Sequence, residues 1–267
     1  MKIENKVFVV TGGGNGIGRE VVLQLLNKGA RVAALDINEK ALQDTVELAG
    51  KLKDRLSTHV ANITDKAAVE ALPQAVAANH GTVDGLVNVA GIIQKFVPFK
   101  KLDFTEIERV MNINFWGTLY MVKAFLPHLL ERPEANITNV SSMGGFLPVP
   151  GQTLYGASKA AVKLFTEGLN SELHETNVHV TIVFPGAIGT NIAANSGVSI
   201  GGVSAENSKI KMTSAKVAGE KIIDGIERNA YRVLIGSDAK MMDFFYRLMP
   251  RHSARIIYQQ MKSILPQ

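Results

Sequence analysis

A tyrosine and a lysine four positions apart could carry proton chemistry in this sequence. Tyr155 and Lys159 lie on a predicted helix, where residues four apart project from one face. A tyrosine can exchange a proton with an alcohol or ketone oxygen if its pKa falls from about 10 toward neutrality, and a nearby ammonium favours the phenolate. An isolated Tyr-xxx-Lys is more often a packed tyrosine beside a solvated lysine, so this interpretation needs supporting residues.

Two further polar residues are candidates for the same chemistry. Ser141 and Ser142 follow a predicted strand over residues 137–140, at the edge where parallel sheets bind ligands. A serine hydroxyl there can hydrogen-bond a substrate oxygen, although a turn serine is the plain alternative. Asn114 lies inside a predicted helix, where asparagine is unfavourable; an exposed polar position is its alternative explanation.

The N-terminal region has the pattern of a dinucleotide-binding site. The glycine-rich residues 11–18 follow the first predicted strand and open the first helix. Glycines let the backbone approach a pyrophosphate, and the helix N-terminus supplies free N–H groups. Asp36 ends the second strand, where a carboxylate binds the adenosine ribose and repels a 2′-phosphate; a helix N-cap is its alternative role. The joint occurrence favours dinucleotide binding over a structural turn.

Short apolar runs alternate with amphipathic stretches along the chain. Runs rich in Val and Ile without polar alternation indicate strands buried on both faces, and strand–helix alternation indicates right-handed βαβ units. We predict a Rossmann-type, doubly wound parallel sheet of about seven strands, with helices on both faces of a single domain. Residues 1–237 would form its dinucleotide-binding and catalytic part, and residues 238–267 a C-terminal amphipathic extension. The stretch 107–130 is predicted as one helix that runs unbroken to Pro127, a residue that can kink or end it. The predicted strands are residues 7–10, 32–35, 56–60, 86–87, 137–140, 178–184 and 233–235.

The order and spacing of these motifs resemble the short-chain dehydrogenase/reductase family over roughly residues 6–235. The resemblance implies alcohol–ketone interconversion with NAD(P), with Asn114, Ser142, Tyr155 and Lys159 as the catalytic set. It selects Ser142 rather than Ser141, and it gives Asn114 the role of holding a water that relays protons from Lys159. The matching motifs are Thr11-Gly12-xxx-Gly16-x-Gly18, Asn88-Val89-Ala90-Gly91, Asn114-xx-Gly117, Ser142, Tyr155-xxx-Lys159, and Pro185-Gly186 followed by Thr190.

The resemblance also implies the residues that bind the cofactor. NADP-preferring members usually carry a basic residue before the second motif glycine or just after the second strand. Asn15 and Ile37 hold these positions here beside the acidic Asp36, so we predict NAD rather than NADP. Two positions depart from the family pattern: Val89 replaces a common Asn, and Asn62 replaces the usual adenine-binding Asp. The implied cofactor residues are Gly12, Asn15, Gly16, Ile17, Gly18, Asp36, Asn62, Ile63, Asn88, Ala90, Gly91, Tyr155, Lys159, Pro185, Gly186, Ile188 and Thr190.

Three loops after the strands are predicted to form the substrate pocket. Residues 92–99, 143–152 and 191–208 are mainly small or apolar, with Lys95 as their one cation. Gly197, Gly201 and Gly202 suggest that the third loop is a mobile lid. We therefore predict a neutral, apolar secondary alcohol or ketone as substrate. A 3-ketoacyl thioester reductase is the main alternative, and a non-catalytic dinucleotide-binding sensor is an alternative of another class.

Composition narrows the cofactors, location and partners. The chain has no cysteine and its six histidines lack metal-ligand spacing, so we expect no metal. It has no run of about 20 apolar residues and no secretory pattern at its start, which favours a cytoplasmic protein. The net charge is +5, and its cations are not interleaved with aromatic residues except near Phe244 to Arg247, which makes nucleic-acid binding the weakest interpretation.

Assembly and the C-terminal segment form the last expectations. The family resemblance favours a homodimer or homotetramer through the helices over residues 107–130 and 152–175, whose candidate contacts are Phe115, Trp116, Tyr120, Phe125, Leu164 and Phe165. The segment from Lys240 onward mixes apolar residues with cations. Capping the pocket or packing against another subunit is favoured there over peripheral contact with an anionic membrane.

Overall fold

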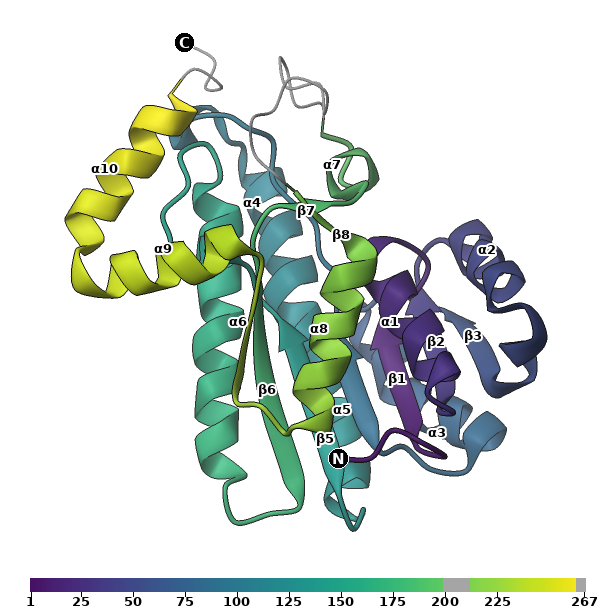
Figure 1. Ribbon diagram of the computed structural model, residues 1–267. Helices are drawn as coiled ribbons and strands as arrows, with labels where there is room; N and C mark the ends of the chain where they lie inside the picture. The colour runs from purple at the N-terminus through teal and green to yellow at the C-terminus, as the bar shows by residue number, and fades with distance from the viewer. Residues whose placement is uncertain (199–211, 263–267) are drawn as a thin grey trace.

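The computed structural model describes residues 1–198 and 212–262. Seven parallel strands form one sheet in the order β3-β2-β1-β4-β5-β6-β9, and helices cover both faces (Figure 1). The predicted doubly wound parallel sheet is confirmed, and each predicted strand is present. The strands are β1 (Val7–Thr11), β2 (Arg31–Asp36), β3 (Leu56–Val60), β4 (Gly85–Asn88), β5 (Ala135–Val140), β6 (Val178–Pro185) and β9 (Arg232–Ile235).

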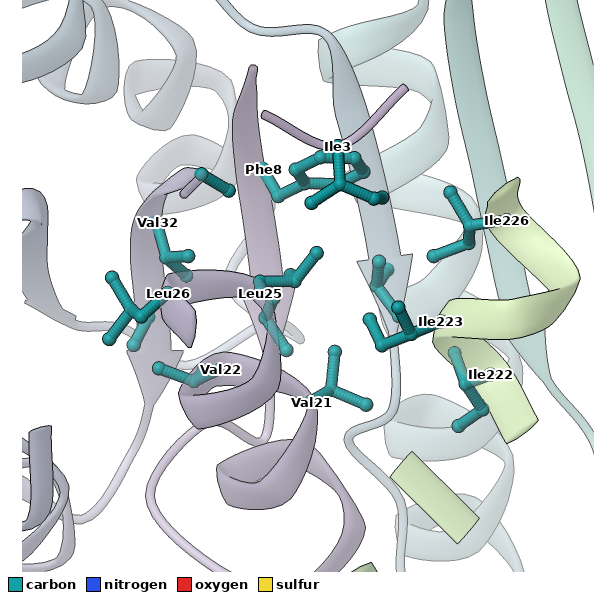
Figure 2. Packing of buried hydrophobic residues seen from close by; sticks show 14 of the residues in the cluster. Ile3, Phe8, Val21, Val22, Leu25, Leu26, Val32, Ile222, Ile223 and Ile226 are labelled. Carbon is teal, nitrogen blue, oxygen red and sulfur yellow. The ribbon is translucent and has the colours of Figure 1, made fainter. Parts of the chain in front are cut away.

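Two apolar layers hold the helices against this sheet. On one face, α1 (Gly16–Asn27), α2 (Glu39–Ala49) and α8 (Ala215–Glu227) pack on the central strands. Figure 2 shows Val21, Leu25 and Ile223 converging on this layer. On the other face lie α3 (Lys66–His80), α5 (Thr118–Leu130) and α6 (Thr153–Glu172). Because strands such as β1 are buried throughout, their Val and Ile side chains contact both layers.

The segment predicted as one helix over residues 107–130 is helical throughout, so the prediction of an unbroken helix is confirmed. Helix α4 (Phe104–Met111) runs directly into a π-turn over Asn112–Gly117, which runs directly into α5. Pro127 lies inside α5, which continues to Leu130, so the proline does not end the helix. Gly117 packs against the segment between β3 and α3. A Cβ added to Gly117 would lie 2.6 Å from the Ile63 side chain. The π-turn brings Asn114 to the interior, as such turns often do at functional sites.

The C-terminal part forms two helices that pack beside the sheet's carboxyl edge. Helices α9 (Ser237–Leu248) and α10 (Pro250–Met261) follow β9 and lie at one side of the molecule (Figure 1). Leu147, Met242 and Ile257 form a small core between these helices and the segment after β5. The Asp238 carboxylate also accepts a hydrogen bond from Ala187 N at 2.7 Å.

The region after β6 is described only in part. A two-stranded parallel ladder joins β7 (Ile188–Gly189) to β8 (Thr213–Ser214), and α7 spans Ile192–Asn195. The predicted lid covers residues 191–208, and its glycines Gly201 and Gly202 lie outside the described residues. Among the described helices, none is long and apolar enough to cross a bilayer.

Candidate active site

The glycine-rich turn joins β1 to α1 at the carboxyl edge of the sheet. Gly12 and Gly16 have φ of +71° and +53°, values that strongly favour glycine. A Cβ on Gly12 would lie 3.0 Å from Ala90 N, and one on Gly18 would lie 2.1 Å from the Gly12 carbonyl oxygen. Asn15 caps α1 by accepting a hydrogen bond from Gly16 N at 2.7 Å. The turn therefore presents bare backbone and a helix N-terminus to the cavity beside it, which suits a pyrophosphate.

A cavity of about 410 Å³ runs along this edge of the sheet. It brings together the glycine turn, the end of β2, the segments after β3 and β4, and the first turn of α6. With one exception, every residue expected to bind the cofactor lines it. That set is Gly12, Asn15, Gly16, Ile17, Gly18, Asp36, Asn62, Ile63, Ala90, Gly91, Tyr155, Lys159, Pro185, Gly186, Ile188 and Thr190.

Asn88 is the exception, because the structure buries it beneath the cavity floor. Its side-chain amide donates to Asn139 Oδ1 at 2.8 Å, and its own Oδ1 has no partner within the described part of the chain. The backbone after β4 is instead held by Thr11. The sequence motif includes this residue, but its role was not predicted. Its hydroxyl oxygen accepts hydrogen bonds from Val89 N at 3.1 Å and Ala90 N at 3.2 Å. Thr11 thereby positions the backbone that forms the cavity floor.

Asp36 stands at the wall of the cavity and anchors the glycine turn. Its two carboxylate oxygens accept hydrogen bonds from Gly14 N and Asn38 N, both at 3.0 Å. The N-cap of α2 is Asn38, which accepts from Ala41 N at 3.0 Å, so the alternative role considered for Asp36 is filled by its neighbour. The Asn62 Oδ1 atom accepts hydrogen bonds from the Thr64 backbone N–H and hydroxyl. These two bonds do not use the Asn62 amide nitrogen.

Tyr155 and Lys159 lie one turn apart at the start of α6 and both line the cavity. Burial raises the pKa of Tyr155 above its ordinary 10.0, while a hydrogen bond from the Ser142 hydroxyl works in the opposite direction. Burial also lowers the pKa of Lys159 from 10.5 to about 8, and its ammonium donates to Val140 O at 3.0 Å. Lys159 was expected to lower the pKa of Tyr155; in this structure burial raises that pKa, and Ser142 rather than Lys159 acts to lower it.

The two neighbouring serines have different tasks. Ser142 lies beside Tyr155, and its hydroxyl oxygen also accepts a hydrogen bond from Gly144 N at 3.1 Å. Ser141 is buried, and its hydroxyl donates to the Lys159 carbonyl oxygen at 2.7 Å. Ser141 therefore fastens the end of β5 to α6, whereas Ser142 has the placement needed to contact a substrate oxygen.

Asn114 is fully buried and holds the segment after β4 against α6. Its Oδ1 accepts from Ile92 N at 2.9 Å, and its amide donates to Ile92 O at 3.0 Å and Ser158 Oγ at 2.9 Å. A Cβ on Gly91 would lie 3.1 Å from both Asn114 Oδ1 and Lys159 Nζ. Asn114 and Lys159 therefore both lie close to Gly91. The Asn114 side chain is hydrogen-bonded to Ile92 and Ser158.

Gln94 is a site residue that the sequence argument missed. It is fully buried, and its Oε1 accepts hydrogen bonds from Leu154 N at 2.7 Å and Tyr155 N at 3.0 Å. Its amide donates to Gly151 O at 2.9 Å, and Gln152 donates to its carbonyl oxygen at 2.9 Å. Gln94 therefore caps the first turn of α6, whose N–H groups have no partner within the helix. Its only sequence signal is an amide following two isoleucines in the loop after β4.

Known proteins with a similar sequence or structure belong to one enzyme family. The family described as short chain dehydrogenase matches residues 6–199. SadH of Mycobacterium tuberculosis, which is named as an oxidoreductase, is 36% identical over 98% of each chain. The 3-oxoacyl-[acyl-carrier-protein] reductase FabG of Thermotoga maritima is 35% identical over 71% of this chain and 77% of its own. A short chain dehydrogenase from Burkholderia cenocepacia, solved in complex with NADP, has a TM-score of 0.80 and 25% identity over 96% of this chain and 99% of that chain.

This chain belongs to the short-chain dehydrogenase/reductase family. It is an oxidoreductase that acts on CH–OH groups with a nicotinamide dinucleotide. Within the described residues, no group of three or more histidine, aspartate or glutamate side chains could hold a metal ion.

Proposed function

We propose that this protein interconverts an apolar secondary alcohol and its ketone, with Tyr155 as acid and base. The observation that carries the proposal is that Ser142, Tyr155 and Lys159 line the same cavity, with the Ser142 and Tyr155 side chains both next to Gly144. Tyr155 exchanges the proton of the substrate oxygen, and Ser142 holds that oxygen by a hydrogen bond. Lys159 places positive charge near the phenol and, by family resemblance, binds the nicotinamide ribose. When bound, the nicotinamide accepts or donates the hydride.

The proposed cofactor preference is NAD(H). Among the described lining residues, the charged ones are Asp36 and Lys159, which lie at the adenosine and catalytic ends. A 2′-phosphate beside Asp36 would meet a carboxylate without the arginine that usually accommodates it. Steady-state rates with both cofactors test this choice. A clear preference for NADP(H) would contradict it.

The substrate class is inferred from the lining near Tyr155. Ile92, Ile93 and Ile192 contribute apolar lining to the cavity, and Phe146 and Leu147, in the segment after Ser142, belong to the small core shared with Met242 and Ile257. A carboxylate or phosphate substrate would normally need an arginine or another free lysine. We expect NAD-linked oxidation to favour apolar secondary alcohols in a panel graded by size and polarity. Higher kcat/KM for short polyols of similar size would overturn this assignment.

A 3-ketoacyl thioester is the second candidate substrate, because the Thermotoga maritima relative is a 3-oxoacyl-[acyl-carrier-protein] reductase. Reduction of an acetoacetyl thioester, compared with a simple ketone of similar apolar size, separates the two candidates. A non-catalytic dinucleotide-binding sensor is the alternative from another class. It would bind the cofactor but turn over none of these substrates.

We further propose a cytoplasmic homo-oligomer that assembles through α4, α5 and α6. Leu164 is 69% exposed, and Trp116 and Phe104 are also exposed on these helices. Phe125 does not belong to this surface, because it is fully buried in the core. Light scattering at micromolar concentration tests the assembly. A monomer that persists at that concentration would count against it.

A further inference from the structure

Helix α9 has two apolar faces, and only one of them packs against the rest of the protein. Ala239 and Met242 are buried on the inner face, with Tyr246 packed against the same small core. A second stripe points outward: its four members are between 41% and 64% exposed and have the spacing i, i+3, i+4, i+7. They are Met241, Phe244, Phe245 and Leu248. A surface helix normally presents one apolar stripe, toward the core, so the outer stripe needs a different explanation.

The exposed apolar surface continues from α9 onto α10. Met249 lies at the bend, and Ile256 and Tyr258 are exposed on α10. Ser253 and Ile257 are buried, so α10 packs through a side that lies between Ile256 and Tyr258. In Figure 1 the two helices form the yellow outer edge of the molecule beside α6. We call the exposed apolar residues of α9 and α10, with Met249, the outer face.

Cations dominate the charge around the outer face. The two acids of this segment point inward: Asp238 accepts from Ala187 N at 2.7 Å, and Asp243 binds Arg232 and Arg247. Among the described residues of this C-terminal segment, four exposed cations have no acidic partner. These four are Lys240, Arg251, Arg255 and Lys262.

The sequence favours pocket capping or subunit packing for this segment, but from the outward apolar stripe and the unpaired cations we propose that the outer face docks on an anionic lipid surface. Phenylalanine, leucine and methionine side chains insert at the boundary between headgroups and acyl chains, while lysine and arginine bind the headgroups. A second copy of this chain is a poorer occupant, because a two-fold contact opposes the same patch. Like cations would then face one another across the interface, which is unfavourable.

The inner face of the same helices links this surface to the catalytic site. Met242 and Ile257 pack with Leu147, in the segment that begins directly after Ser142. Docking would therefore hold the segment after Ser142, which is predicted from the sequence to form part of the substrate pocket, near the bilayer. The docking itself does not depend on the proposed substrate, and it can be measured without turnover.

Co-sedimentation of the full chain with vesicles tests the proposal. We expect binding to vesicles of phosphatidylcholine mixed with phosphatidylglycerol, weaker binding to phosphatidylcholine alone, and a loss of binding in high salt. The pair Phe244→Gln/Leu248→Gln should weaken binding by at least about tenfold. The pair Lys240→Gln/Arg251→Gln should weaken it by about fivefold for each cation removed.

Matched controls keep the result specific. Leu48→Gln removes an apolar side chain that is 60% exposed on α2, and Lys51→Gln removes a distant surface cation; both should bind vesicles like the natural protein. Thermal melting confirms that each variant is folded. Equal vesicle binding by the Phe244→Gln/Leu248→Gln variant, or no binding to either vesicle type, would overturn the proposal. If that variant instead dissociates an oligomer in light scattering and vesicles are not bound, the outer face belongs to a second copy.

Discussion

Replacing Lys159 with methionine should change how the stability of the protein depends on pH. Lys159 is buried, and burial lowers its pKa from 10.5 to about 8. Between these two values the unfolded chain holds the proton more often than the folded chain does. Stability rises with pH wherever the unfolded state binds more protons, so Lys159 makes the natural protein more stable as the pH rises above 8. Methionine is unbranched and of similar length, and it removes this contribution.

The size of the effect follows from the two pKa values. The unfolded lysine binds more protons than the folded lysine between pH 7 and pH 9. Integrated over this range, the difference raises the unfolding free energy by about 1.3 kcal/mol. Tyr155 adds little over this range, because its pKa lies above 10 in the folded state. The substitution also leaves the Val140 carbonyl without its lysine donor, at a cost of about 1–3 kcal/mol. That cost is the same at both pH values and cancels when the pH dependences are compared.

Urea unfolding of both proteins at pH 7 and pH 9 provides the measurement. The natural protein should gain about 1.3 kcal/mol relative to Lys159→Met over this interval. All other titrating groups are common to both proteins, so their contributions cancel in the difference. If the unfolding free energy changed equally with pH in the two proteins, Lys159 would have an ordinary pKa. The claim that burial lowers this pKa would then be refuted.

Substitutions at four further positions test the site. Tyr155→Phe should lower kcat at least about a thousandfold and leave the dissociation constant of the cofactor, measured by fluorescence titration, nearly unchanged; substantial residual turnover would refute its role. Gln94→Ala should cost about 1–3 kcal/mol in urea unfolding, because two α6 N–H groups lose their acceptor; Gln94→Glu keeps that acceptor but sets a buried carboxylate oxygen against the Gly151 carbonyl and should also destabilise the protein. Gly18→Ala should abolish cofactor binding and lower Tm, since its Cβ would lie 2.1 Å from the Gly12 carbonyl; an unchanged melting curve would contradict this packing. Asp36→Ser should reduce the preference for NAD(H) in steady-state rates, and an unaltered ratio would place specificity elsewhere.

The sequence by itself determined the sheet and most of the cavity wall. Runs of Val and Ile mark strands that are buried on both faces, and parallel strands place their carboxyl ends at one edge. Glycines in the first turn and a Tyr-xxx-Lys pair are local patterns whose geometry follows from the helix and the turn themselves. These signals predicted β1, α1 and α6 with the residues that they bring to the cavity.

Only the tertiary structure decided which distant groups complete the site. Gln94 caps α6 from a loop about 60 residues earlier, and Asn88 turns toward Asn139 rather than the cavity. The π-turn between α4 and α5 and the outward orientation of the α9 stripe are likewise not revealed by periodicity. A local sequence pattern indicates that a side chain prefers burial or helical structure. The partner of a hydrogen-bond acceptor or of an apolar stripe, however, lies on another element of the fold. The partner of each is therefore set by how the elements pack together.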